Sequence, residues 1–211
     1  MDKLQTILKK ITIRRSFVAT AVVVLLVALS FALWRELAMA PESLPDEVSR
    51  QEVVGMTLSE SEPTHIRIPE ISVDATFEAP LGLKENNEIE VPDGYEEVAY
   101  YKYGPTPGEL GPSVILGHVD SYQGAAVFYL LGQLEEGDEI EIDREDGTTA
   151  IFAVTRLERH EQSGFPTVEV YQDIDHAGLR LITCSGTYNH GTLRYSHNLI
   201  VFAKLVGVIE S

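Results

Sequence analysis

The feature that most restricts the fold of this 211-residue chain is an alternating segment at residues 138–154. Within it, Glu139–Asp143 alternates strictly between acidic and apolar side chains, Asp146-Gly147 supplies a turn, and Thr149–Val154 resumes an extended pattern. Strict alternation places the apolar side chains on one face of a strand and the charged ones on the other. The segment therefore predicts a β-hairpin with one buried and one solvated face.

Short strand-like segments also make up most of the remaining sequence from residue 64 onward. Runs of apolar and β-branched residues bounded by Gly, Pro, Asn or Asp are typical of strands. The further strands that we expect are Ile66–Glu78 (broken at Pro69), Ile89–Pro92, Val98–Tyr103, Val114–Leu116, Leu179–Cys184 and Asn198–Leu205.

Helical patterns are few and short. Gly124–Leu134 carries apolar residues that predict one short helix packed on the sheet, and Phe165–Tyr171 indicates a loop with a helical turn. About eight strands with one or two short helices predict a mainly β fold, a closed or nearly closed β-barrel. A β-sandwich is the alternative.

The first 40 residues differ from the rest and predict a membrane segment. Phe17–Leu33 contains no charged residue and follows five Lys or Arg residues. Its length falls within the roughly 17–25 residues of a spanning helix. Basic residues on the N-terminal side keep that side cytoplasmic. We therefore expect a cytoplasmic N-terminus at 1–16, an uncleaved transmembrane signal-anchor at 17–34 and an extracytoplasmic remainder, so that the protein is a single-pass protein of the cell membrane.

A cleaved signal peptide is the competing interpretation, because Ala38–Ala40 fits a small-residue cleavage site. The apolar run is, however, longer than the roughly 7–15 residues of a signal peptide, and Pro41 would directly follow the cut. Both features favour the uncleaved anchor.

Charge is distributed unevenly along the chain. Residues 41–211 hold 10 basic and 31 acidic residues, a net charge of −21. Such an acidic body argues against binding to nucleic acid, whose affinity depends on Lys and Arg. Residues 41–63 contain six of these acidic residues and no sustained apolar periodicity, which predicts an acidic exposed linker between the membrane and a domain at 64–211.

The only cysteine, Cys184, ends the predicted strand Leu179–Cys184. Outside the cytoplasm a lone cysteine has no intramolecular disulfide partner, so it is inert and buried, bonded to another chain, or reactive. Another apolar run, Ser113–His118, brings a histidine to a strand end in the same way. A thiol, an imidazole and the later Arg194 at strand edges are the parts of an enzyme with a cysteine nucleophile.

Residues 64–205 resemble a sortase, a membrane-anchored cysteine transpeptidase of bacterial surfaces, and are most similar to class F of that family. A Leu-x-Thr-Cys motif alone would be a weak signal, but here it follows a Gly-His pair 66 positions upstream. The motifs that carry the resemblance are Ile68–Ala75, Pro107–Glu109, Val114–Ser121, Val127-Phe128, Gly137-Asp138 and Leu181–Cys184.

The resemblance implies that Cys184 is the nucleophile, that His118 exchanges protons with the thiol and the leaving amine, and that Arg194 stabilises the oxyanion. Arg194 is the only arginine beyond Cys184, although class F relatives place theirs nearer Ser196 or Asn198. Positions 194, 196 and 198 share one face of an extended strand, so Arg194 is still expected to reach the site.

Two further residues are candidates for supporting roles. Thr183 is expected to help position the substrate, and Asp120 to orient His118, with capping of a local turn as an equal alternative for Asp120. His190 and His197 lie near Arg194, but their spacing from the cysteine fits no usual zinc pattern. No metal and no cofactor are expected.

As a sortase, the protein is expected to cleave an LPxTG-like C-terminal sorting signal of secreted proteins and to transfer the acyl group to an amine on the cell wall or on another protein. The resemblance places substrate selection at about Arg156–Gly178. Two alternatives remain open at this point: a non-enzymatic anchored β-domain that binds surface partners, and a sortase-like cysteine protease that only hydrolyses. A cell-wall L,D-transpeptidase is disfavoured, because that family has Ser-His-Gly before its cysteine.

Overall fold

The computed structural model describes residues 50–52, 55, 57–85 and 88–210. The predicted cytoplasmic segment 1–16, the predicted anchor 17–34 and the first part of the predicted linker lie outside these residues. In the described part of the chain, no helix is long and apolar enough to cross a membrane.

The predicted hairpin at residues 138–154 is confirmed. Strand β8 (Glu139–Arg144) pairs antiparallel with β9 (Thr148–Glu161), which continues seven residues past Val154. Ile140 and Ile142 are fully buried, whereas the acidic residues between them are partly exposed. The alternation of the sequence therefore decides which face of the hairpin enters the core.

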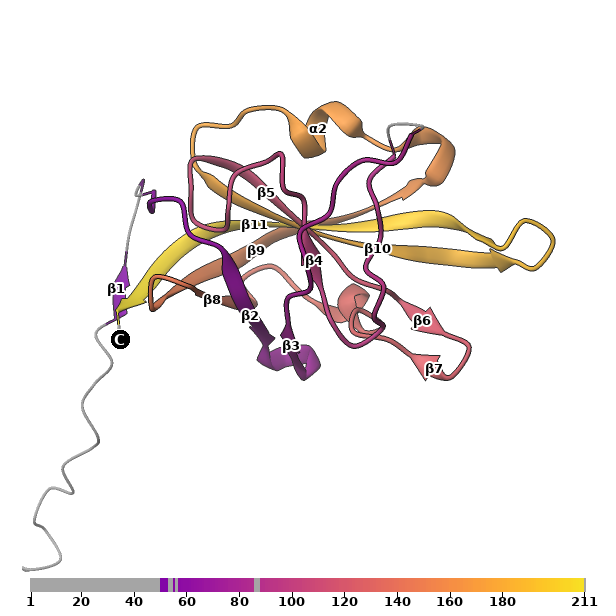
Figure 1. Ribbon diagram of the computed structural model, residues 1–211, viewed down its shortest axis with the longest axis horizontal. Coiled ribbons are helices and arrows are strands. Elements are labelled where there is room, and N and C mark those ends of the chain that lie inside the picture. The colour runs from indigo at the N-terminus through magenta and orange to yellow at the C-terminus, as the bar shows by residue number, and fades with distance from the viewer. Residues whose placement is uncertain (1–49, 53–54, 56, 86–87, 211) are drawn as a thin grey trace, which may run out of the picture. The chain divides into compact units, whose positions relative to one another are not determined.

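Eight strands form one curled sheet in the order β3-β2-β8-β9-β11-β10-β5-β4, and the short β1 pairs with β11 (Figure 1). A separate two-stranded sheet joins β6 to β7. The bounds of the remaining strands are β1 Arg50–Glu52, β2 Pro63–Ile68, β3 Val73–Thr76, β4 Ala99–Tyr100, β5 Gly111–Leu116, β6 Asp120–Ser121, β7 Gly124–Ala125, β10 Ala177–Asn189 and β11 Arg194–Glu210.

The two outer strands of this sheet approach each other, so the barrel is nearly closed. Phe77, just after β3, forms a parallel bridge with Val98, just before β4. The Glu78 N–H donates to the Val98 carbonyl at 2.8 Å, and the Val98 N–H donates to the Thr76 carbonyl at 3.1 Å. The prediction of a mainly β, nearly closed barrel of about eight strands is therefore confirmed.

Pro69 separates β2 from β3, as the sequence predicted. A short 3-10 helix, η1 (Pro69–Ile71), occupies the break, and Ser72 follows in the left-handed region with φ of 54°. Because proline has no N–H to donate to a sheet ladder, the strand ends before it and the chain reverses.

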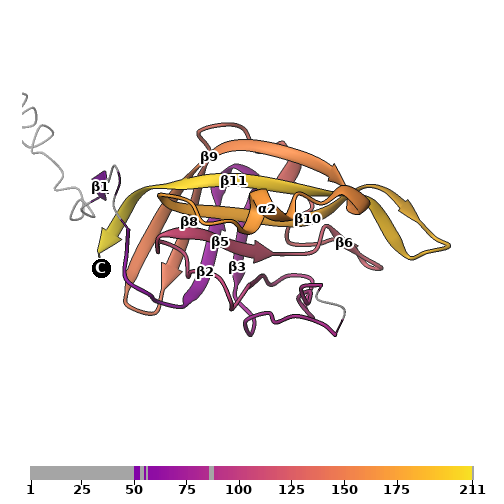
Figure 2. The same cartoon turned by 90° about the horizontal axis from the view of Figure 1, so that it is seen from above.

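The long strands β10 and β11 carry apolar side chains on both faces. Leu181 and Val201 point into the barrel core, whereas Ile182 and Ile200 lie in a second apolar cluster on the outer face. That outer face is covered by α2 (Thr167–Tyr171), which confirms the predicted helical turn (Figure 2). Burial on both faces explains why these strands show continuous apolar runs instead of alternation.

The prediction of a helix over Gly124–Leu134 is wrong. The segment begins with β7 and continues in tight turns that end in the 3-10 helix η2 (Leu131–Gln133). Phe128, Leu131 and Leu134 are buried at three-residue intervals. The Leu131 N–H donates to the Phe128 carbonyl and the Leu134 N–H to the Leu131 carbonyl. Their spacing of three is the 3-10 period, which resembles a helical pattern over so short a stretch.

Two further predictions need correction. Ile89–Pro92 is not a strand, since only Ile89 forms an isolated bridge, with Leu83. The strand predicted to end at Cys184 instead continues as β10 to Asn189. Gly186, with φ of 82°, takes up a bulge in which β10 has one more residue than β11. The bulge lets β10 and β11 remain paired past this glycine.

The last part of the predicted linker contacts the domain. The Leu58 N–H donates to the Gly108 carbonyl at 2.7 Å, and the Ser61 N–H donates to Thr106 Oγ1 at 3.1 Å. The Arg144 guanidinium, buried beneath, donates to the Ser59 carbonyl. These contacts attach residues 58–61 to the barrel.

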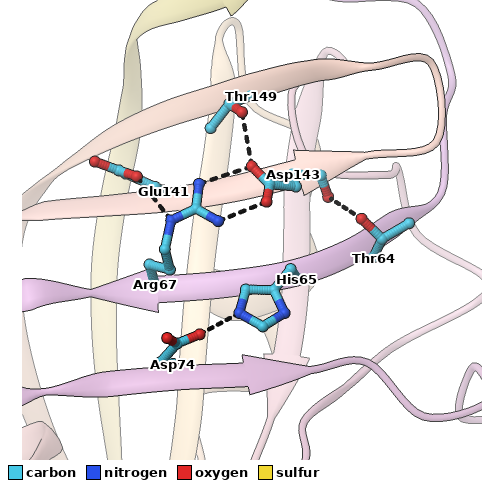
Figure 3. Close-up of polar contacts among 7 residues, drawn as sticks. All are labelled: Thr64, His65, Arg67, Asp74, Glu141, Asp143 and Thr149. Carbon is cyan, nitrogen blue, oxygen red and sulfur yellow. Dashed lines mark hydrogen bonds and ion pairs between the residues drawn. The ribbon is translucent and has the colours of Figure 1, made fainter. Parts of the chain in front are cut away.

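A polar cluster, hereafter the Arg67 cluster (Arg67, Glu141, Asp143 and Thr149), lies across β2, β8 and β9 (Figure 3). Arg67 donates to both Asp143 oxygens, at 2.5 and 2.7 Å, and to Glu141 Oε2 at 3.0 Å. Hydrogen bonds from Arg67 lower the pKa of Asp143, and the bond to Asp143 raises the pKa of Arg67. The cluster ties three strands together away from the catalytic candidates.

Candidate active site

The parallel pairing of β5 with β10 brings the two principal candidates together. Leu116 pairs with Ile182, and the Gly117 N–H donates to the Ile182 carbonyl at 3.2 Å. His118 and Cys184 each follow this last pair by two residues. Because the parallel register sets these two positions side by side, the imidazole and the thiol are delivered to one corner of the sheet, where β5 ends and β10 continues.

Cys184 is a free, partly buried thiol, paired across the ladder with Asn198 of β11. Burial raises the pKa of the Cys184 thiol, and the negative charge of Asp120 raises it further. The thiol is therefore protonated at neutral pH. Attack on a carbonyl from this state requires a base to take the proton.

His118 is partly buried and is held from two sides by the loop between β3 and β4. Its Nε2 lies 2.8 Å from the Pro92 carbonyl oxygen, and its ring lies against Tyr95 with 4.9 Å between ring centroids. Gly117 has to be a glycine, because a Cβ there would lie 2.6 Å from the Phe128 ring. The Phe128 ring therefore packs directly against the backbone at Gly117, next to the histidine.

Asp120 does not contact His118 in the way that the sequence suggested. Its Oδ2 accepts a hydrogen bond from the Tyr195 hydroxyl, which connects β6 with β11 beside the thiol. Burial, followed by the bond to Asp120, raises the pKa of Tyr195 to about 12. Asp120 therefore acts on Cys184 by its charge, and Tyr195 holds it in place.

Arg194 lies at the far end of the β10–β11 hairpin, where it is exposed and pairs with Asn189. It precedes Asn198, the partner of Cys184, by four residues, or about 13 Å of extended strand. Ser196, two residues before Asn198, accepts a hydrogen bond from the Thr187 N–H at 2.9 Å. The oxyanion role of Arg194 stays a prediction, and Asn198 is the β11 residue directly opposite the thiol.

Thr183 faces away from the corner. It pairs with Leu199 and is only 5% exposed, on the barrel side of the strand. Its Oγ1 is buried and has no hydrogen-bond partner among the described residues. The predicted role in substrate positioning gains no support from this placement.

The face that leads to Cys184 along β10 is covered by the stretch in which we expected substrate selection. Arg180 and Ile182 precede Cys184 on the same face of the strand. Val170 of α2 packs onto this face, and Glu169 forms an ion pair with Arg156 of β9. Burial, together with the positive charge of Arg156, lowers the pKa of Arg180 to about 10.

Both arginines flank the same aromatic ring. The guanidinium carbons of Arg156 and Arg180 lie 3.6 and 4.6 Å from the centroid of Phe202.

Residues 57–85 and 88–210 contain no group of three or more His, Cys, Asp or Glu side chains that could hold a metal ion.

Sequence reasoning missed several residues that shape this corner: Pro92, Tyr95, Tyr195 and Asn198. Each acts through a contact with a residue distant in sequence, such as the 26 positions between Pro92 and His118. The Tyr195–Asp120 contact spans 75 positions. A local pattern carries no signal for such pairs. Asn198 is the exception, because the resemblance described above suggested an arginine near Ser196 or Asn198.

Comparisons with known proteins agree with this geometry. A model of the sortase domain matches residues 66–206. A Clostridium perfringens sortase D5 transpeptidase is 23% identical, over 70% of this chain and 79% of its own, with a TM-score of 0.51. Sortase A of Listeria monocytogenes is 15% identical, over 72% of this chain and 92% of its own, with a TM-score of 0.53.

A lid mutant of sortase A from Corynebacterium diphtheriae is 21% identical, over 79% of this chain and 74% of its own, with a TM-score of 0.53. At these sequence identities, the similarity to the three solved structures shows a shared fold and nothing more. No curated protein matches the chain. The sortase-domain match spans more than half of the chain and includes both Cys184 and His118, and the chain therefore belongs to the sortase family.

Proposed function

We propose that the protein is a membrane-anchored cysteine transpeptidase that cleaves a C-terminal sorting signal and transfers the acyl group to an amine. The observation that carries the proposal is the placement of Cys184 and His118, each two residues past Ile182–Leu116, the last pair of the parallel ladder between β10 and β5. Family membership supports the same chemistry, since sortases are cysteine transpeptidases.

In the first half of the reaction, His118 takes the thiol proton as Cys184 Sγ attacks the carbonyl carbon of a Thr–Gly-type bond. A C–S bond forms and the carbonyl oxygen becomes an oxyanion, which hydrogen-bond donors stabilise. When the tetrahedral species collapses, the C–N bond breaks. The His118 imidazolium gives its proton to the departing amine, and a thioester on Cys184 remains.

In the second half, an amine attacks the thioester carbonyl and a new C–N bond forms. His118 takes the proton that the amine loses, the C–S bond breaks, and the resting thiol is restored by that proton. Water in place of the amine gives hydrolysis, so the competition between water and amine decides between a transferase and a protease.

The finer parts of the proposal rest on the sequence. The uncharged run at 17–34 supports a membrane anchor with an extracytoplasmic catalytic domain. The ordered motifs support class F, an LPxTG-like sorting signal and an amine acceptor on the cell wall or on another protein. Arg194 is proposed as an oxyanion donor, which requires its side chain to reach toward Asn198 from the hairpin end.

The test is mass spectrometry of the full chain in detergent micelles, incubated with a peptide that contains Leu-Pro-x-Thr-Gly, with and without an added amine. The wild type is compared with the Cys184→Ala and His118→Ala variants. The expected result is an acyl adduct on Cys184 that resolves onto the amine and is absent from both variants.

Hydrolysis without transfer to any amine tested would replace the transpeptidase proposal with the protease alternative. A Cys184 thiol that forms no adduct and resists alkylation in the folded protein would overturn the catalytic proposal and favour a non-enzymatic domain.

A further inference from the structure

We propose that Glu78 is a positioning residue that holds His118 in one tautomer through the loop at residues 92–95. The inference deepens the proposed function and rests on it, because it concerns how the proposed base is prepared for the thiol. It is carried by a chain of short contacts that runs from Glu78 through the loop to the imidazole.

The first contact decides which ring nitrogen carries the proton. His118 Nε2 lies 2.8 Å from the Pro92 carbonyl oxygen. A carbonyl oxygen only accepts hydrogen bonds, so Nε2 must be the donor. The neutral imidazole is then the Nε2–H tautomer, and Nδ1 is the only nitrogen left to accept the proton of Cys184.

The second contact fixes the orientation of the Pro92 carbonyl. Immediately after the buried Pro92, the N–H groups of Asp93 and Gly94 donate to the two carboxylate oxygens of Glu78, at 2.9 and 2.6 Å. One carboxylate thus caps two consecutive amides. Since the peptide unit is planar, holding the Asp93 N–H also holds the orientation of the Pro92 carbonyl.

The backbone of Glu78 is anchored to the core of the barrel. Its own N–H donates to the carbonyl of Val98, which is fully buried in the core where the outer strands of the barrel meet. Gly94 leaves no room for a side chain, because a Cβ there would lie 2.5 Å from Glu78 Oε1 and 2.1 Å from Glu97 Oε2. A side chain at position 94 would therefore displace the carboxylate from the two amides.

The far side of the loop is also anchored. The Val127 N–H donates to the Tyr95 carbonyl at 2.9 Å, while the Tyr95 ring rests against the His118 ring. Asp120, the acidic residue nearest to His118 in the chain, is bonded to Tyr195 instead. The orientation of His118 therefore depends on a neutral carbonyl whose position is set by Glu78.

The test is a long-range proton–nitrogen NMR correlation spectrum of the full chain, with 15N-labelled histidine, in detergent micelles at mildly alkaline pH. Ordinary imidazoles are neutral there. The chain has six histidines, and the signal of His118 is identified by its loss in His118→Gln. The wild type is expected to show His118 as the Nε2–H tautomer alone.

In Glu78→Ala, the spectrum of His118 is expected to shift toward a mixture with the Nδ1–H tautomer. The rate constant kcat is expected to fall by about 10- to 100-fold with little change in KM, because a misplaced catalytic group costs rate more than binding. Glu78→Gln should lie between the wild type and Glu78→Ala in both properties, since its single amide oxygen accepts from one loop N–H while its NH2 group faces the other. Glu70→Ala, which removes an exposed carboxylate from η1, is the matched control.

An Nδ1–H tautomer in the wild type would overturn the inference. So would an unchanged tautomer and an unchanged kcat in Glu78→Ala. If Glu78→Ala does not fold, the Gln variant and the wild-type tautomer still decide the question. A Cys184 thiol that forms no adduct and resists alkylation in the wild type would refute the proposed function, whereas an active enzyme with a tautomer insensitive to Glu78 would refute the positioning role alone.

Discussion

The Arg67 cluster and the corner that holds Cys184 and His118 use charge in opposite ways. In the cluster, Arg67 is bonded to two carboxylates, and its hydrogen bonds lower the pKa of Asp143. At the corner, burial and a nearby carboxylate raise the pKa of the Cys184 thiol. Arg67 and Asp143 favour each other's ionised form, while the corner disfavours the ionised form of its nucleophile.

The Arg67 cluster therefore serves the stability of the fold, whereas the corner serves the reactivity of the thiol. Compensated charges stabilise three strands where no chemistry is proposed. The thiol is kept in its neutral form, so that the thiolate arises only as a base removes the proton. Residues of the cluster should therefore affect unfolding and not turnover, and residues of the corner should do the reverse.

The largest effect is expected from His118→Ala. Loss of the base and acid should lower the rate of acylation by about 10²–10⁴-fold, with little change in the unfolding temperature. Single-turnover mass spectrometry with the sorting peptide measures the rate. His65→Ala is the matched control, because His65 contacts Asp74 on β3 near the Arg67 cluster. A comparable loss of acylation rate in both variants would contradict the proposed division between residues for stability and residues for reactivity.

The next effect is expected from Arg67→Met. It leaves the carboxylates of Glu141 and Asp143 without their shared partner. Since the Arg67 side chain is 34% exposed, solvent reduces the cost, and we expect a loss of about 1–2 kcal/mol in unfolding free energy. Urea denaturation measures this quantity. Turnover at a temperature well below unfolding should be unchanged, and a drop in kcat there would contradict the comparison.

A smaller effect concerns acid stability. Because the pKa of Asp143 is lower in the folded protein than in the unfolded chain, the folded state resists protonation. The stabilisation from this residue is complete above the unfolded pKa of about 3.9 and is lost as pH falls through the folded value. In Asp143→Asn, unfolding free energy measured over this range should fall less steeply than in the wild type. Equal slopes would show that Asp143 does not contribute.

The smallest effect is expected from Asp120→Asn, which removes the negative charge beside the thiol. The pKa of Cys184 should fall, so that the pH profile of its alkylation by iodoacetamide shifts to lower pH. Asp74→Asn, on β3, provides the comparison for a charge removed elsewhere. A shift to higher pH in Asp120→Asn would mean that Asp120 acts on Cys184 chiefly through His118 or Tyr195.

Local patterns in the sequence predicted the strands well and the contacts between them poorly. The alternation at Glu139–Asp143 specified both the hairpin and its buried face. The apolar run before His118 predicted the end of β5, whereas the strand predicted to end at Cys184 continues to Asn189. The parallel register that places the two residues together depends on pairing across more than 60 residues. The wrong helix at Gly124–Leu134 arose because a spacing of three fits a 3-10 turn as well as an α-helix.

The residues that hold His118 and Asp120 in place could not be predicted from such local patterns. Glu78 and Pro92 matter because a loop folds back onto His118, and Tyr195 because a hairpin passes beside Asp120. These arrangements are set by tertiary packing. No periodicity or motif in the chain encodes them.

The position of β11 has a consequence for the order of assembly. Although it is the last strand in the sequence, it lies between β9 and β10 in the middle of the sheet. A ribosome or an export channel releases it after every other strand. Until it arrives, β9 and β10 have no shared neighbour, and Cys184 has no partner across the ladder. The sheet around Cys184 is thus completed only after the other strands have been synthesised, so this part of the fold depends on pairing that forms late.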